Sequence, residues 1–299
     1  MIRLALIIAT YNRAEQLVAV LESVVRQDLP AGEWECVVVD NNSTDDTPAR
    51  FGAFVAAHPG FNLRMVCETA PGVSCARNRG IAETTAPCLA IIDDDERINP
   101  GFVRAYADFF DACPDALAAG GRIVPEYVTG RPAWMSKYTE VPIANPMDFG
   151  DAVRPFPAGR IPGGGNMALR RSAVERYGSF DPALGRVGGK LIGGEESDLF
   201  ERMLLGGETL WYVPGAVMWH IIPPEKLTGD YFRRLCYNVG VSQRMRARIG
   251  RTYPKAVVRE CLKWGATLLL AFTMRPCKSL WLMRMRYGIS RGLFSRTDD

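Results

Sequence analysis

The stretches LALIIA (4–9), AEQLVAVLESVVRQ (14–27) and CVVV (36–39) decide the fold of this 299-residue chain. The first and third are short, continuous apolar runs, which are typical of parallel strands covered on both faces. The middle stretch has a helical spacing of its apolar residues, namely Leu17, Val20, Leu21, Val24 and Val25. The order strand, helix, strand predicts an α/β sheet.

The same alternation continues outward from these stretches. A helix is predicted at about 46–58, a strand near 63–67, a helix near 73–83 and a strand at 88–92. Beyond them the sequence predicts helices at about 101–112, 170–177 and 195–206, and strands near 117–124 and 209–213. We therefore expect an open, doubly wound α/β sheet with its ligand crevice at the C-terminal ends of the strands. The Pro- and Gly-rich stretch 125–165 is assigned to substrate loops.

Charge is unevenly divided along the chain. Residues 226–299 carry a net charge of +12, whereas the remainder carries −9. The basic residues of this C-terminal region alternate with Leu, Trp, Phe and Met, which favours an anionic lipid surface over nucleic acid. The segment 256–274 is interrupted by charges and is too short in its apolar part to cross a bilayer, which needs about 20 residues. We expect a catalytic domain at 1–225 and a basic, interfacial helical region at 226–299. The alternative for this region is a helix that only packs within the protein.

The eight cysteines form no CxxC pair and no short metal-ligand spacing. This pattern fits a reduced, cytosolic compartment. The run LALIIA is too short for the core of a signal peptide and leads directly into TYNR. We therefore interpret it as a buried strand.

Three consecutive aspartates close the strand predicted at 88–92, in the sequence IDDDE (92–96). Crowded carboxylates repel one another unless a cation neutralises them, and Mg²⁺ or Mn²⁺ binds carboxylates together with phosphate oxygens. The sequence thus indicates a divalent cation on a diphosphate. The alternative is a solvated acidic turn in which Asp95 or Asn99 caps a helix.

Polar residues also follow the two preceding strands. The stretches ATYNR (9–13) and VVDNNSTDDT (38–47) contribute Thr10, Tyr11, Arg13, Asp40 and Asn42, which we expect around the same crevice. In PGVSCARNRG (71–80), Arg77 and Arg79 lie near a helix start, where two guanidiniums can hold a diphosphate or one of them can pair with an acidic neighbour.

These motifs resemble those of family 2 glycosyltransferases with the GT-A fold, up to about residue 225. The matching stretches, in order, are ATYNR, VVDNNSTDDT, GVSCARNRGI, IDDDE, GGGNMALRR (163–171) and GGEESDLFERM (193–203). The resemblance implies a Rossmann-like, open mixed sheet with helices on both faces. It also implies a nucleotide-diphosphate sugar as donor, with UDP favoured, a Mn²⁺ or Mg²⁺ ion, and inversion at the anomeric carbon.

Site residues are carried over by position. The resemblance implies that Thr10, Tyr11 and Asp40 bind the nucleotide, with Arg77 at its base or phosphates. It places Asp93 at the ribose and Asp95 on the metal, while Asp94 can exchange roles with either. The donor sugar is expected against Gly164, Gly165 and Asn166, because glycine permits close approach and Asn can bond hydroxyls.

The resemblance further implies a catalytic base in GGEESDL. The family usually has Glu-Asp at this point, and the second position is Glu196 here, so Glu196 or Glu195 is the candidate. Inverting transfer independently requires a carboxylate that takes the proton of the acceptor hydroxyl. The alternative is that both acids simply open a helix. His220 follows an apolar run at a place where GT-A enzymes often have a metal-binding histidine, although a lone histidine can equally be a core residue.

Together these observations predict an enzyme that glycosylates a saccharide or lipid-linked saccharide in cell-surface polysaccharide synthesis, bound to the inner face of the membrane. One alternative is a nucleotidyltransferase, but TYNRAEQ (10–16) supplies no glycine-rich phosphate loop. The other is a sugar-nucleotide-binding or scaffolding protein without transferase activity. The acids at 93, 95 and 196 argue against it.

Overall fold

The computed structural model describes residues 1–188 and 191–295. Its contacts divide the chain into two compact units. Unit 1 comprises residues 1–124, 147–182 and 195–221, and unit 2 comprises residues 125–146, 183–194 and 222–299. Unit 2 therefore takes in two earlier segments besides the C-terminal region. The boundary at 225/226 and the membrane role of 226–299 stay predictions.

Within the described residues, nine strands form one sheet in the order β3-β2-β1-β4-β8-β6-β9-β5, with β7 paired to β9. The strands are β1 (Leu4–Thr10), β2 (Trp34–Asp40), β3 (Leu63–Cys67), β4 (Cys88–Asp93), β5 (Glu96–Ile98), β6 (Ala118–Tyr127), β7 (Arg154–Pro155), β8 (Met167–Arg170) and β9 (Leu210–Ile222). The first four are mutually parallel, whereas β8 runs antiparallel to β4, β6 to β8, and β5 to β9. The sheet is mixed, as the resemblance implied.

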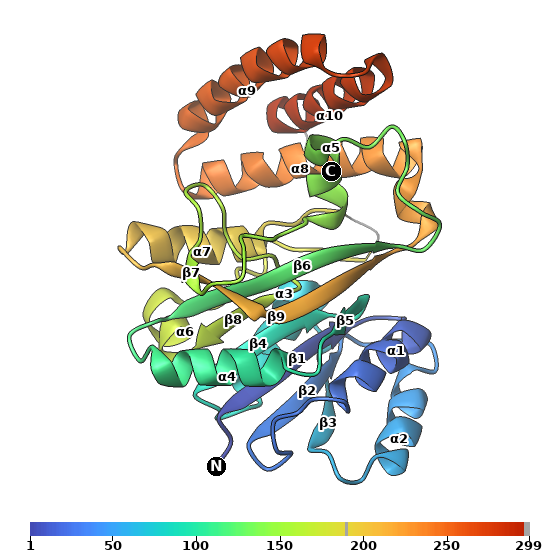
Figure 1. Cartoon of the computed structure of the whole chain (residues 1–299), viewed down its shortest axis with the longest axis vertical. Helices are drawn as coiled ribbons and strands as arrows, with labels where there is room; N and C mark the ends of the chain where they lie inside the picture. The colour runs from blue at the N-terminus through green and yellow to red at the C-terminus, as the bar shows by residue number, and fades with distance from the viewer. Residues whose placement is uncertain (189–190, 296–299) are drawn as a thin grey trace. The chain divides into compact units, whose positions relative to one another are not determined.

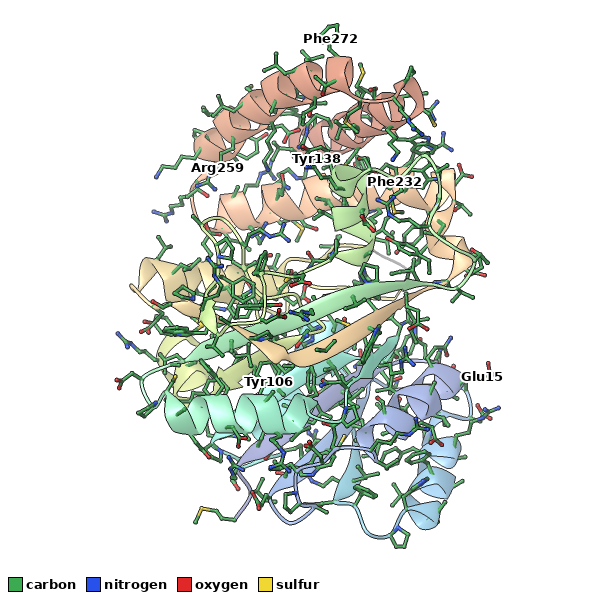
Figure 2. All side chains as sticks on the ribbon, in the orientation of Figure 1. Glu15, Tyr106, Tyr138, Phe232, Arg259 and Phe272 are labelled. Atoms are coloured by element: carbon green, nitrogen blue, oxygen red, sulfur yellow. The ribbon has the colours of Figure 1, made fainter. Side chains whose placement is uncertain are left out.

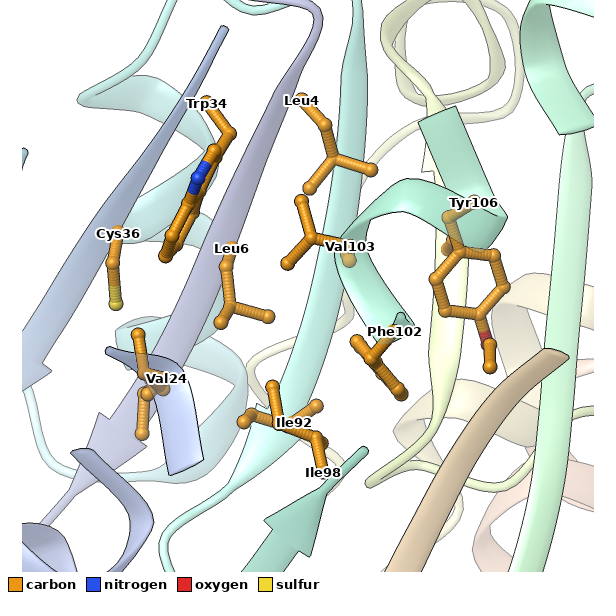
Figure 3. Close-up of a cluster of buried hydrophobic side chains, with 14 of the residues drawn as sticks. Leu4, Leu6, Val24, Trp34, Cys36, Ile92, Ile98, Phe102, Val103 and Tyr106 are labelled. Carbon is orange, nitrogen blue, oxygen red and sulfur yellow. The ribbon is translucent and has the colours of Figure 1, made fainter. Parts of the chain in front are cut away.

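Helices cover both faces of the unit 1 sheet (Figure 1). One face packs against α1 (Ala14–Val24), α2 (Thr47–Ala57) and α4 (Phe102–Ala112), and the other against α3 (Val73–Ala82), α6 (Arg171–Tyr177) and α7 (Glu195–Leu205). Alternate residues of β1 divide between the faces, with Leu4 and Leu6 in one core and Ala5 and Ile7 in the other. Figure 3 shows the first of these cores, where Leu6 and Val103 lie between β1 and α4.

Several elements differ from the sequence predictions. The short strands β5, β7 and β8 were not predicted. The stretch assigned to substrate loops contains a helix, α5 (Lys137–Ala144), which begins at Ser136 with a capping box formed with Thr139. The strand predicted near 209–213 continues to Ile222, past Pro214 and Gly215. His220 therefore lies inside β9, opposite Glu96 of β5.

Unit 2 consists mainly of helices. It contains α5, α8 (Gly229–Ile249), α9 (Tyr253–Thr273), α10 (Pro276–Phe294) and the short 3-10 helix η1 (Pro224–Leu227). Its core gathers Met135, Ile143, Phe232, Leu282 and Ile289. Phe232 and Tyr138 are marked in Figure 2.

None of the helices in the described part of the chain combines the length and the apolar character that a bilayer crossing requires. All eight cysteines are free.

Candidate functional site

Three strand ends of unit 1 meet at one edge of the sheet. Parallel pairing sets Thr10 beside Asp40, and it sets Ala9 of the same strand beside Asp93. The polar residues that follow β1, β2 and β4 therefore gather at the carboxyl edge of the sheet, which is where open α/β sheets bind ligands.

The side chain of Asp94 hydrogen-bonds residues at and just after the end of β1. Its carboxylate accepts hydrogen bonds from Thr10 Oγ1 at 2.8 Å and from Arg13 Nη1 at 2.7 Å. Burial raises the pKa of Asp94 to about 6 against the opposing pull of Arg13. The middle aspartate thus links the acidic turn to the end of β1.

The two outer aspartates instead meet a third acid. Within the described residues, Asp93, Asp95 and Glu96 each offer a carboxylate oxygen, and these oxygens lie within 4.8 Å of one another. Glu96 is buried, and burial together with Asp93 raises its pKa well above the usual range. Three hard oxygen donors at this spacing suit Mg²⁺ or Mn²⁺. Glu96 was missed in the sequence analysis, although it closes the quoted IDDDE stretch.

Gly165 leaves the space that the Glu96 carboxyl group fills. A Cβ atom at position 165 would lie 1.7 Å from Glu96 Oε1, which no structure tolerates. At Gly164 the nearest atom to such a Cβ would be an Arg77 nitrogen at 3.4 Å, an ordinary contact. In this structure, close approach at Gly165 serves a buried acid.

Gly165→Ala is therefore expected to destabilise the protein by about 1–3 kcal/mol, the usual cost of overpacking, because Glu96 has to leave its buried position. Gly164→Ala is the matched control, and it should change the free energy of unfolding by less than about 1 kcal/mol, because its Cβ would make only ordinary contacts. Urea unfolding of both variants measures the difference. Equal midpoints for the two would show that Glu96 does not depend on the space at 165.

Arg77 connects the acidic cluster to helix α7. Its guanidinium is 2% exposed and donates to Asp93 Oδ1 at 2.7 Å, to Glu195 Oε1 at 2.7 Å and to the carbonyl of Gly164 at 3.0 Å. Burial opposes its charge, but Asp93 and Glu195 keep the pKa of Arg77 above its ordinary value. Arg79, by contrast, pairs with Glu83 one helical turn away. Of the two arginines, one lies in the site and the other pairs with an acidic neighbour.

The two glutamates that open α7 have different environments. Glu195 is buried against Arg77. Glu196 is half-buried, and a Cβ atom at Gly164 would lie 3.7 Å from its Cγ. Burial and the negative charge of Glu195 raise the pKa of Glu196 to about 7. A carboxylate with that pKa is suited to accept a proton near neutral pH.

The loops that follow β1 and β2 also lie at the carboxyl edge of the sheet. Asp40 is buried and accepts a hydrogen bond from the Ser43 amide, while Tyr11 is 46% exposed. Asn42 has a positive φ of 64°. Asn12 Oδ1 accepts from the Thr44 amide and so joins the two loops.

Another asparagine that the sequence analysis did not single out orders the next loop. The side chain of Asn41 donates to the carbonyls of Glu68 and Ala70 and accepts from the amide of Gly72, just before α3. Asn12 lies two residues after the end of β1, and Asn41 directly follows β2. The side chain of an Asn at such a position commonly hydrogen-bonds nearby backbone. Their positions in the sequence could therefore have indicated that both residues order the loops.

Two further candidates, Asn166 and His220, lie next to or within strands of the sheet: Asn166 precedes β8 and His220 lies within β9. Asn166 is fully buried, and its amide nitrogen donates to the carbonyls of Arg122 and Ala216 while its oxygen accepts from Tyr106. Both amide hydrogens are used inside the fold, so we leave the Asn166 side chain out of the donor site. His220 faces Glu96 across the β5–β9 pair and does not belong to the cluster of three carboxylates found in the described residues.

The chain is similar to known glycosyltransferases both in sequence and in fold. The profile of glycosyl transferase family 2 matches residues 5–178. The glucosyl-dolichyl phosphate glucuronosyltransferase of Haloferax volcanii is 26% identical over 262 residues, covering 85% of this chain and 79% of that protein. The succinoglycan biosynthesis protein ExoO of Rhizobium meliloti is 33% identical over 113 residues, so the chain spans only 31% of its length.

Among solved structures, the mannosyltransferase PcManGT from Pyrobaculum calidifontis, in complex with GDP-Man and Mn²⁺, superposes with a TM-score of 0.62. The alignment covers 99% of this chain and 88% of that one at 19% identity. The similarity is therefore one of fold, and that fold is GT-A.

Proposed function

The chain belongs to glycosyl transferase family 2, and from this premise we propose that it transfers a sugar with inversion from a nucleotide-diphosphate donor to a saccharide hydroxyl. The observation that carries the proposal is the bridge formed by Arg77. This single buried side chain joins Asp93 of the acidic cluster to Glu195, the neighbour of a carboxylate with a pKa of about 7. This connection supports a site in which the acidic cluster holds a cation and Glu196 accepts a proton.

The proposed transfer begins at Glu196. Its carboxylate takes the proton from the acceptor hydroxyl, and the oxygen forms a bond to the anomeric carbon. The bond from that carbon to the diphosphate oxygen breaks from the opposite face, and the nucleoside diphosphate leaves with the electron pair. Glu195 is the less suitable base, because its carboxylate is already hydrogen-bonded to Arg77.

Asp93, Asp95 and Glu96 would hold a divalent cation, since their oxygens already converge. When bound, Mn²⁺ or Mg²⁺ stabilises the negative charge that develops on the diphosphate. We keep Asp95 as the principal ligand and add Glu96 to it, while His220 remains a candidate ligand from the neighbouring strand.

Thr10, Tyr11, Asp40 and Asn42 are proposed to hold the nucleotide. Tyr11 offers an exposed ring for a base, and the carboxylate of Asp40 can accept from a base or ribose. Arg13 ties its loop to Asp94. We favour UDP as the nucleotide and place the sugar beside Gly164, because the space at Gly165 is filled by Glu96.

The acceptor is proposed to be a lipid-linked saccharide. The relative from Haloferax volcanii, by its name, adds glucuronic acid to a glucosyl-dolichyl phosphate, and its alignment covers most of both chains. A role in cell-surface polysaccharide synthesis fits the match to the succinoglycan biosynthesis protein.

A panel of nucleotide sugars incubated with Mn²⁺ tests the proposal. One of them is expected to release its nucleoside diphosphate, and Asp95→Ala should lower that release at least about a hundredfold, since a metal ion supplies several kcal/mol to such a step. Asp115→Ala, which removes an exposed aspartate on another loop, is the control and should match the parent protein. Full activity of the Asp95 variant would remove the metal assignment.

Helix α9 supports a membrane-surface location. Its buried residues are polar, Glu260 and Thr267, whereas its most exposed apolar side chains include Leu262, Leu269 and Phe272 at 69%, 74% and 89%. Phe272 lies on the outer side of α9 (Figure 2). Glu260 accepts from Arg286 and Ser290 of α10. A helix with polar residues inside and apolar residues outside suits an apolar environment such as a lipid surface. The net charge of +12 over 226–299 complements anionic lipid headgroups.

Leu262→Gln/Leu269→Gln is expected to weaken co-sedimentation with phosphatidylcholine–phosphatidylglycerol vesicles by roughly a hundredfold, because burying each leucine contributes about 1.5–3 kcal/mol. The matched control is Leu204→Gln/Leu205→Gln on α7, which changes two exposed leucines of unit 1. Unchanged sedimentation of the α9 variant would show that the apolar face does not bind the lipid surface.

A further inference from the structure

Helices α8 and α10 line a basic, aromatic pocket that opens to the surface of unit 2. The cavity measures about 400 Å³, and its lining includes Arg233 and Tyr237 of α8 together with Trp281, Arg284 and Arg291 of α10. On α10, residues 284, 287, 288 and 291 share one helix face by their spacing of three and four. The site is built from unit 2 alone and has no part in the proposed transfer chemistry.

Aromatic rings hold two of the guanidiniums in place. Arg284 lies over the Trp281 ring at 5.0 Å, and Arg291 lies near the rings of Tyr237 and Tyr287 at 5.7 and 6.0 Å. Trp281 is itself stacked on Trp134 with 4.5 Å between ring centroids. A guanidinium stacked on a ring keeps its in-plane N–H groups available for an anion.

The cations of the pocket exceed its acids. Arg233 pairs with Asp230, whereas in residues 1–188 and 191–295 neither Arg284 nor Arg291 has a carboxylate partner. The three arginines and one aspartate leave a formal charge of +2 around the cavity. A phosphate monoester carries about −1.5 to −2 at neutral pH, while a carboxylate carries only −1.

The two helices that line the pocket pack closely against each other. A Cβ atom at Gly288 would lie 2.9 Å from the Cβ of Cys236, and one at Gly292 would lie 2.0 Å from the carbonyl oxygen of Tyr237. These contacts hold Tyr237 of α8 beside the arginine face of α10. The spacing of the two helices is therefore set before any ligand binds, which lowers part of the entropic cost of binding.

We propose that this pocket binds a phosphate monoester group, with Arg284 and Arg291 as its principal ligands and the aromatic rings contacting the carbon atoms attached to it. The cavity is much larger than a phosphate alone, since a water molecule occupies about 30 Å³. The phosphate can belong to a lipid headgroup or to a soluble phosphate ester. The proposal does not depend on the transferase assignment, and it is separate from the apolar contact of α9.

The experiment compares vesicles of phosphatidylcholine with phosphatidic acid, which presents a phosphate monoester, and vesicles with phosphatidylglycerol at the same total charge. The whole chain is expected to bind the phosphatidic acid vesicles at least about tenfold more tightly, because a phosphate monoester offers three terminal oxygens and more negative charge to the two guanidiniums than a phosphodiester does. Arg284→Ala/Arg291→Ala should abolish this preference while binding to phosphatidylglycerol persists.

The matched control is Lys255→Ala/Arg259→Ala, which removes two charges from α9 outside the pocket (Arg259 is marked in Figure 2). It should weaken binding to both vesicles equally and keep the preference. Since all four side chains are exposed or partly exposed, the variants are expected to fold, and circular dichroism checks this.

Calorimetry with glycerol 3-phosphate in the presence of EDTA distinguishes the two sources. Binding of this ester that is lost in Arg284→Ala/Arg291→Ala supports a soluble phosphate ester as ligand, and a preference confined to vesicles supports a lipid. The proposal is overturned if neither probe shows binding that depends on these two arginines. It is also overturned if the α9 control loses the preference as well.

Discussion

Glu196→Gln is expected to lower release of the nucleoside diphosphate by about 10²–10⁴-fold while donor affinity stays within a factor of about two, because only the proton acceptor is lost. Glutamine has the same shape as glutamate but no basic oxygen at neutral pH. The donor contacts proposed for Thr10 and Asp40 come from other strand ends and remain intact. Single-turnover kinetics and calorimetry with the nucleoside diphosphate measure the two quantities.

The pH dependence gives an independent test of the same residue. Burial and Glu195 raise the pKa of Glu196 to about 7, so the base is protonated below that pH and free above it. The rate should rise with pH up to about 7 and then level off, and this limb should vanish in Glu196→Gln.

Glu201→Gln, on the exposed side of the same helix, is the control and should keep both the rate and the pH profile. Normal turnover in the Glu196 variant would move the base to Glu195 or to another residue.

Arg77→Met is expected to destabilise the protein by about 3–5 kcal/mol, since it leaves the carboxylates of Asp93 and Glu195 without their shared cation. Methionine retains most of the side-chain volume, so the loss reports the ion pairs more than packing. Urea unfolding at neutral pH measures it.

Arg79→Met provides the control on the same helix. Arg79 forms a partly exposed pair with Glu83 one helical turn away, and such helix-surface pairs contribute about 0.3–0.5 kcal/mol. A similar small effect for both variants would mean that the buried bridge does not stabilise the fold.

The strand ends of unit 1 could be predicted because they are marked locally. Each short apolar run stops at polar residues, as at Thr10, Asp40 and Asp93, and parallel strands bring such ends to one edge. Thr10, Asp40 and Asp93 therefore lie at one edge of the sheet, while the roles assigned to them stay predictions.

The sequence did not predict which acids form the cluster of three carboxylates, because this depends on partners that are distant in the sequence. Asp94 leaves the cluster since Thr10 and Arg13 bind it, and Glu96 joins the cluster since β5 pairs with β9 and Gly165 makes room. In sequence, three adjacent aspartates are equivalent, and only the fold distinguishes them.

Local signals were also weak in the stretch 125–165. Pro142 lies inside α5, and a proline is usually taken as evidence against a helix interior. Likewise, the sequence of α9 shows mixed apolar and basic residues but not which side packs, and it is the Glu260–Arg286 pair that turns the polar side inward.

The inward-turned ion pair of α9 has a practical consequence for handling the protein. In plain buffer, Leu262, Leu269 and Phe272 face water with nothing to cover them in the described part of the chain, so concentrated samples should self-associate. A mild detergent above its micelle concentration would shield these side chains, and solubility during purification would then depend on the choice of amphiphile more than on ionic strength.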